Sequence, residues 1–177
     1  DTVGGMISIR AGVSNTGTAS AKGGSVEISG GVGSGMSGGA ITLLTGYGSK
    51  TSSGSITIRT VNAGNAGGSG RLSFSSGTTS DGHSGSLSIG TGYATKGKAG
   101  SITMTVGSGN TGNGGDVHIF AGETTAVNTV GGMVSIRAGV SSTATTSSKG
   151  GSVEIAGGVG SGMSGGAITL LTGFGSK

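Results

Sequence analysis

The sequence predicts an all-β protein, a β-solenoid (parallel β-helix) of roughly eleven coils with about 15 residues in each coil. Three observations predict this fold: a short repeat runs through the whole chain, apolar residues alternate with polar ones inside each repeat, and glycine separates the repeats. The chain has 177 residues, of which 45 are glycine, and it contains no proline, cysteine or tryptophan. Without a repeat, this glycine-rich composition would indicate a disordered linker. The prediction of a folded chain therefore depends on the repeat.

Each short repeat contains two apolar residues two positions apart, in most cases followed three positions later by glycine. Alternation with period two is typical of a strand with one buried face. A repeat of about 15 residues is too short for a strand and a crossover helix, so we expect each strand to stack on the next at about 4.8 Å. The apolar pairs expected to fill the interior are Ile7/Ile9, Val26/Ile28, Ile41/Leu43, Ile56/Ile58, Leu72/Phe74, Leu87/Ile89, Ile102/Met104, Val117/Ile119, Val134/Ile136, Val153/Ile155 and Ile168/Leu170.

A longer repeat relates the two ends of the chain, because "DTVGGMISIRAGVS" at Asp1 returns as "NTVGGMVSIRAGVS" at Asn128. Residues 1–50 and 128–177 differ at eight positions. We interpret residues 1–177 as one continuous solenoid segment of a longer tandem array, with a super-repeat at 1–127 and a second copy beginning at 128–177. The widest spacings between apolar pairs fall at 14–22, 123–130 and 141–149, where we expect loops.

Charge and composition exclude several partners. The formal net charge of +4 comes from ten basic and six acidic residues scattered along the chain, and aromatic residues make up 3%. Without a basic cluster or stacking aromatic residues we expect no nucleic-acid partner. No apolar run approaches the roughly 20 residues of a membrane span. The absence of cysteine excludes disulfides and thiolate metal sites.

Two glycine motifs match known binding patterns, and we interpret neither as a cofactor site. Gly33-Ser34-Gly35-Met36-Ser37-Gly38 fits the G-x-G-x-x-G pattern of nucleotide-binding loops, but a strand-like segment follows it where that pattern needs a helix. "GNGGDVHIF" resembles the calcium-binding nonapeptides of secreted toxins, which carry an Asp in every turn. Here only Asp116 occupies that place, so the sequence predicts no cofactor and no metal.

The sequence also contains no pattern that would bring catalytic residues together. The six acidic residues fall in different repeats, and we expect Glu27 to form at most a surface ion pair with Arg10, one coil away. We interpret His83, in a turn-like stretch, and His118, at an outward strand position, as solvated side chains. The sequence therefore predicts that the protein is not an enzyme and has no catalytic residues.

Hydroxyl side chains recur between the two apolar residues of most repeats. In a solenoid they would form a flat face that resembles the ice-binding surfaces of antifreeze solenoids, although Glu27, Arg71, Asp116 and His118 interrupt it. Solubility alone also explains serine and threonine at outward positions. The candidate surface-binding residues are Ser8, Thr42, Thr57, Ser73, Ser88, Thr103, Ser135 and Thr169.

Stretches such as "SGSLSIGTGYATKGKAGSITMTVGSGNTGNGGDVHIFAGETT" resemble the Gly/Ser/Thr-rich repeat proteins of diatoms and related microalgae. The resemblance covers the whole chain and implies secreted cell-surface, cell-wall or adhesive material. We therefore expect an extracellular structural protein that forms fibres or walls and associates with copies of itself, end to end or side by side. The alternative is a module that binds ice, glycan or mineral through the hydroxyl face, so polysaccharide and mineral are candidate partners.

Overall fold

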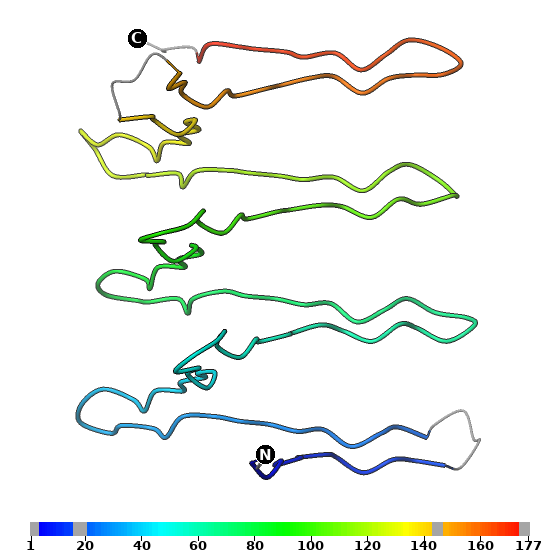
Figure 1. The fold of residues 1–177 in the computed structure, drawn as a ribbon, viewed down its shortest axis with the longest axis vertical. Helices are drawn as coiled ribbons and strands as arrows, with labels where there is room; N and C mark the ends of the chain where they lie inside the picture. The colour runs from blue at the N-terminus through cyan, green and yellow to red at the C-terminus, as the bar shows by residue number, and fades with distance from the viewer. Residues whose placement is uncertain (1–3, 16–20, 143–146, 174–177) are drawn as a thin grey trace. The chain divides into compact units, whose positions relative to one another are not determined.

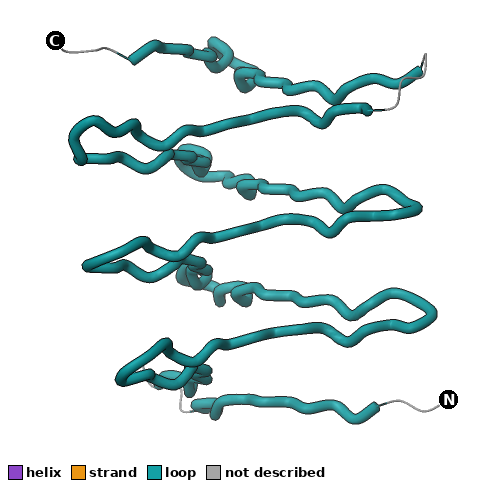
Figure 2. The backbone as a smooth tube through the Cα atoms, turned by 90° about the vertical axis from the view of Figure 1, so that its left-hand side faces the viewer, coloured by secondary structure: helices purple, strands orange, loops and turns teal. Residues whose placement is uncertain are grey.

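The fold comes from a computed structural model that describes residues 4–15, 21–142 and 147–173. These residues contain no helix and no β-strand, and the chain is drawn throughout as plain loop (Figures 1 and 2). The predicted β-solenoid is therefore wrong. The chain divides into two units, Asp1–Ser88 and Ile89–Lys177. The division falls inside one short repeat and does not coincide with the start of the second long copy.

The chain leaves most of its surface in contact with solvent. Its accessible surface is 18044 Å² for a mass of 16.4 kDa. A compact protein of this mass exposes about 7,500 Å², and a fully unfolded chain exposes about 24,000 Å². Within the described part of the chain no residue is buried, and only Ala11, Gly48, Ala94, Ala138 and Ser148 are partly shielded. No hydrophobic core holds these residues together.

The short repeat is nonetheless visible in the backbone. Between sharp bends the chain runs in long, nearly straight stretches (Figure 1). From residue 34 to residue 126 the starts of successive bends are evenly spaced, and their spacing follows the spacing of the apolar pairs. The bends lie at 34–36, 49–51, 65–67, 80–82, 95–97, 110–113, 126–128 and 161–163.

Many of these bends lie inside loops that are closed by a main-chain hydrogen bond between two glycines. In every such bond the later glycine donates its N–H to the carbonyl of the earlier one, across a single loop. In the first unit the bonds are Gly24 to Gly12 (2.9 Å), Gly39 to Gly31 (2.8 Å) and Gly54 to Gly46 (3.1 Å). In the second unit they are Gly132 to Gly122 (2.9 Å), Gly151 to Gly139 (2.9 Å) and Gly166 to Gly158 (2.8 Å).

These bonds explain why the solenoid prediction fails. A solenoid pairs each strand with the equivalent strand one coil away, at a separation of about 15 residues, through a continuous ladder. Here the closing bonds join residues within one loop, and no ladder extends from them along the described segments. The pairs expected to stack stay open to solvent, with Val26 53%, Ile41 52% and Ile56 57% exposed.

Glycine is required where the backbone of a loop approaches itself. A Cβ atom added to Gly33 would lie 2.8 Å from the carbonyl oxygen of Met36 and closer still to that of Ser37. Real Cβ atoms do not make contacts this short with backbone, so a larger residue would force the loop open. Gly160, the equivalent residue of the second copy, meets the carbonyl of Ser164 in the same way.

Candidate functional site

The structure does not assemble the predicted hydroxyl face. A flat face needs adjacent strands, and the described residues form none. Each of the eight predicted side chains is exposed, and none of them makes a hydrogen bond within the part of the chain that the structure describes. These residues are Ser8, Thr42, Thr57, Ser73, Ser88, Thr103, Ser135 and Thr169. They are exposed hydroxyls that no strand brings into one face, and a role for them in binding ice, glycan or mineral stays a prediction.

The G-x-G-x-x-G match at Gly33–Gly38 lies inside the loop that Gly39 and Gly31 close. The described chain contains no helix that could follow it, so the helix N-terminus that holds a phosphate is missing. Gly107–Gly112 also fits the G-x-G-x-x-G pattern, and the chain bends there at 110–113, where Gly112 has a φ of 75°. Both motifs are explained by the bending of the chain.

The one side-chain cluster in the described residues that combines a charged group with aromatic rings is formed by Asp116, His118 and Phe120. In an extended chain, residues two positions apart point to the same side. The Nε2 atom of His118 lies 3.8 Å from Oδ2 of Asp116. The imidazole also stacks on the Phe120 ring, with centroids 5.7 Å apart and planes inclined by 12°. Both side chains remain well exposed, 67% for His118 and 79% for Asp116.

From the sequence, Asp116 is the one acidic residue at the nonapeptide position, His118 is a solvated side chain, and both interrupt the hydroxyl pattern. Phe120 is not singled out. The spacing of Asp116, His118 and Phe120, two positions apart, is the sequence signal that indicates this cluster. In the preceding repeat the three equivalent same-side positions hold Ser101, Thr103 and Thr105. An Asp, a His and a Phe at all three positions make this segment different from its neighbours.

The remaining charged candidates stay apart. No ion pair joins Arg10 and Glu27, both of which the structure describes, so the expected surface pair does not form. His83 has no partner among the described residues. A shallow hollow is lined by the four consecutive residues Arg59, Thr60, Val61 and Asn62, and no other described part of the chain contributes to it. The described residues contain no group of three or more His, Asp or Glu that could hold a metal ion.

Comparison with known proteins yields no relative: no family model matches the chain, and neither the curated proteins nor the solved structures contain a significant match. In the described part of the chain there is no helix of the length and apolar character needed to cross a membrane.

Proposed function

We propose that this chain is a segment of an extracellular structural protein, a repeat scaffold whose copies associate into fibres or wall material, without enzymatic activity. The observation that carries the proposal is the agreement between the two copies of the long repeat. The loop closed by Gly31 and Gly39 returns in the second copy as the loop closed by Gly158 and Gly166, and both bonds are 2.8 Å long. The loop closed by Gly12 and Gly24 also returns, with a bond of the same length. Local geometry that repeats with the sequence is typical of a scaffold that presents the same surface many times.

The exposed apolar pairs support self-association. A single chain with so little buried surface gains little hydrophobic stabilisation, because that term scales with the apolar area removed from water. Large exposed apolar surfaces in proteins usually mark places where another molecule binds. The pairs recur at regular spacing, so a second copy could cover many of them at once.

The resemblance of the repeats to Gly/Ser/Thr-rich proteins of diatoms and microalgae supports a location at the cell surface. The absence of cysteine from the sequence means that such a material would be held together by contacts other than disulfides.

Electron microscopy and sedimentation over a range of protein concentrations test the proposal. We expect unbranched filaments or large side-by-side assemblies above a critical concentration. The double variant Ile41→Ser and Ile168→Ser changes equivalent positions of the two copies. Each substitution removes an apolar side chain whose burial is worth about 1.5–3 kcal/mol, so the critical concentration should rise by about tenfold or more.

The matched control is the double variant Thr42→Ser and Thr169→Ser, which alters the neighbouring exposed positions and leaves the apolar pairs intact. It should assemble like the natural chain. A natural chain that sediments as a monomer at every concentration would exclude the proposed role, and equal assembly of both double variants would exclude the apolar pairs as its cause.

A further inference from the structure

Asn113 and Gly114 form the only Asn-Gly pair in the sequence. Asparagine before glycine is chemically special, because no Cβ on the next residue shields its main-chain nitrogen from the asparagine side chain. Asn113 is also the last residue of the bend at 110–113. The remaining asparagines are each followed by alanine or threonine, and they are Asn15, Asn62, Asn65, Asn110 and Asn128.

The structure leaves both groups of this pair free to react. Asn113 is exposed, and its side-chain amide makes no hydrogen bond within the described part of the chain. The main-chain N–H of Gly114 likewise donates to no acceptor among the described residues. Asn110 differs, because its Oδ1 accepts a hydrogen bond of 3.3 Å from the hydroxyl of Thr111. Neither partner of the Asn-Gly pair is held by such a contact.

We propose that Asn113-Gly114 is a site of spontaneous deamidation, a covalent modification that needs water and no enzyme. The main-chain nitrogen of Gly114 loses its proton and attacks the side-chain amide carbon of Asn113. The new N–C bond closes a succinimide ring, and the side-chain nitrogen of Asn113 takes up protons and leaves as ammonia. Water then opens the ring at either carbonyl. One product is aspartate, and the other is isoaspartate, in which the main chain continues through the former side-chain carbonyl.

The backbone around Gly114 can adopt the conformation that ring closure requires. Glycine reaches more of φ/ψ space than any other residue. A Cβ added to Gly114 would meet nothing within 4 Å, so no neighbouring group restricts the chain there. The segment also belongs to no helix or strand, whose main-chain hydrogen bonds would oppose the rotation.

Deamidation changes the charge and the chain of this segment. Either product replaces a neutral amide with a carboxyl group, so each event adds one negative charge to a chain whose formal net charge is +4. The new charge lies three positions before Asp116. Isoaspartate also adds a methylene group to the main chain at the bend. This inference goes beyond the proposed structural role and holds whether or not the chain assembles.

Incubation of the full chain at mildly alkaline pH, with samples mapped by tandem mass spectrometry, tests the proposal. Asn113 should convert at least about tenfold faster than Asn62 and Asn65, which are also exposed but precede alanine. Such a ratio corresponds to a difference of about 1.4 kcal/mol between the reaction barriers. Methylation by an isoaspartate-specific methyltransferase should label the product at the same position.

The variant Gly114→Ala should slow the conversion of Asn113 by about tenfold, because the added Cβ crowds the attacking nitrogen. The matched control is Gly109→Ala, where an added Cβ likewise meets nothing within 4 Å and the Asn-Gly pair stays intact. The control should convert at the natural rate. The proposal is overturned if Asn113 converts no faster than Asn62 and Asn65, if Gly114→Ala converts at the natural rate, or if both alanine variants slow the reaction equally.

Discussion

The main-chain N–H of Gly39 donates a hydrogen bond of 2.8 Å to the carbonyl of Gly31, and in the second copy Gly166 and Gly158 form the same bond at the same length. Another close approach accompanies it in both copies, since a Cβ added to Gly30 or to Gly157 would collide with the carbonyl of the closing glycine. The sequence of each loop thus determines its closure locally, without help from a core.

Substitution of Gly33 by alanine should open the first of these loops. The added Cβ would meet the carbonyls of Met36 and Ser37, and the backbone must move to avoid them. The closing bond is worth about 1 kcal/mol, so amide hydrogen exchange at Gly39 should accelerate about fivefold. The exchange of Gly166, in the second copy, provides an internal reference that should not change.

Gly35→Ala is the matched control in the same loop, because an added Cβ at Gly35 meets nothing within 4 Å. It should leave the exchange of Gly39 near its natural rate. Equal acceleration by both alanine variants would mean that the loop responds to the loss of glycine flexibility and not to the carbonyls of Met36 and Ser37.

Asn128 should be replaceable by glycine but not by valine. It is the only non-glycine residue with a positive φ, 58°, among those that the structure describes. The left-handed region costs most L-residues about 1–2 kcal/mol and is least favourable for β-branched ones. Asn128→Val should therefore disrupt the loop closed by Gly132 and Gly122, whereas Asn128→Gly should preserve it.

The side chains of this loop provide the measurement. The Thr129 hydroxyl donates to the carbonyl of Ala126 at 2.8 Å, and its oxygen lies 3.1 Å from that of Thr124. Nuclear Overhauser contacts between Thr124 and Thr129 should persist in Asn128→Gly and vanish in Asn128→Val. Their survival in the valine variant would contradict the importance of the left-handed conformation.

Calorimetry of the dilute, unassembled chain should show a small heat-capacity change on unfolding. The accessible surface of 18044 Å² leaves about 6,000 Å² to be exposed, about a third of what a compact chain of this mass exposes when it unfolds. Compact proteins gain about 12–15 cal/mol/K per residue, so this chain should gain about a third of that. A full-sized, cooperative transition in monomeric protein would contradict the open structure.

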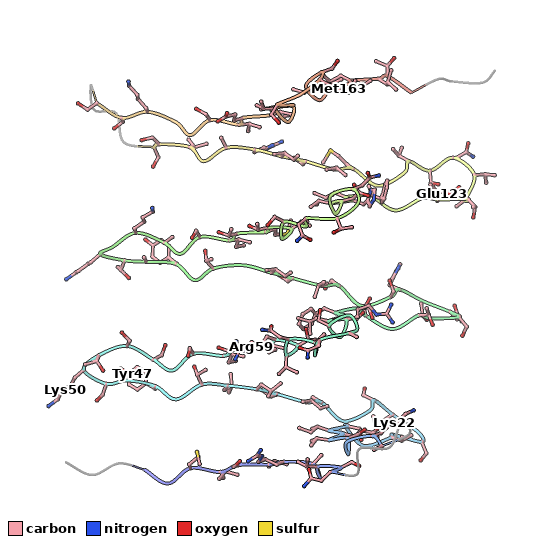
Figure 3. All side chains as sticks on the ribbon, turned by 90° about the vertical axis from the view of Figure 1, so that its right-hand side faces the viewer. Lys22, Tyr47, Lys50, Arg59, Glu123 and Met163 are labelled. Atoms are coloured by element: carbon pink, nitrogen blue, oxygen red, sulfur yellow. The ribbon has the colours of Figure 1, made fainter. Side chains whose placement is uncertain are left out.

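Trypsin should distinguish the loops from the straight segments once the protein assembles. Arg59 and Arg71 adjoin apolar pairs, whereas Lys50 and Lys96 lie in the bends at 49–51 and 95–97; Figure 3 shows Lys50 beside Tyr47 at the first of them. If copies cover the apolar pairs, cleavage after the two arginines should slow by about tenfold in assemblies, because proteolysis follows the accessible population. Mass spectrometry of the fragments should show continued cleavage after the lysines, and uniform protection would contradict this arrangement.

The period of the fold could be predicted from the sequence, and its arrangement could not. The apolar pairs at Ile41 and Ile56 recur with the spacing that separates the backbone bends. Alternation, however, shows only that one side of a segment is apolar, and it does not show what covers that side. The same pattern fits a strand stacked in a solenoid and an exposed segment, so the interior expected around Val26, Ile41 and Ile56 did not follow from it.

The cluster of Asp116, His118 and Phe120 could be predicted only in part, because sequence spacing alone does not determine which side chains meet. The spacing of Asp116 and His118 is the same as that of Asp81 and His83, yet only the first pair faces each other. The difference lies in the backbone, which bends at 80–82, where Gly82 has a φ of 106°, and has no bend at 116–120. The two segments share the Asp-x-His spacing, so the local conformation of the backbone is what distinguishes them.

Because every glycine-to-glycine closing bond joins two residues of the same loop, each loop carries both partners of its own bond. Deleting or inserting one whole repeat would leave all other loops with intact partners. Replication slippage in the gene could therefore lengthen or shorten the array without a folding penalty at the junction. We expect alleles of different copy number to yield chains that differ in length and share the same local conformation.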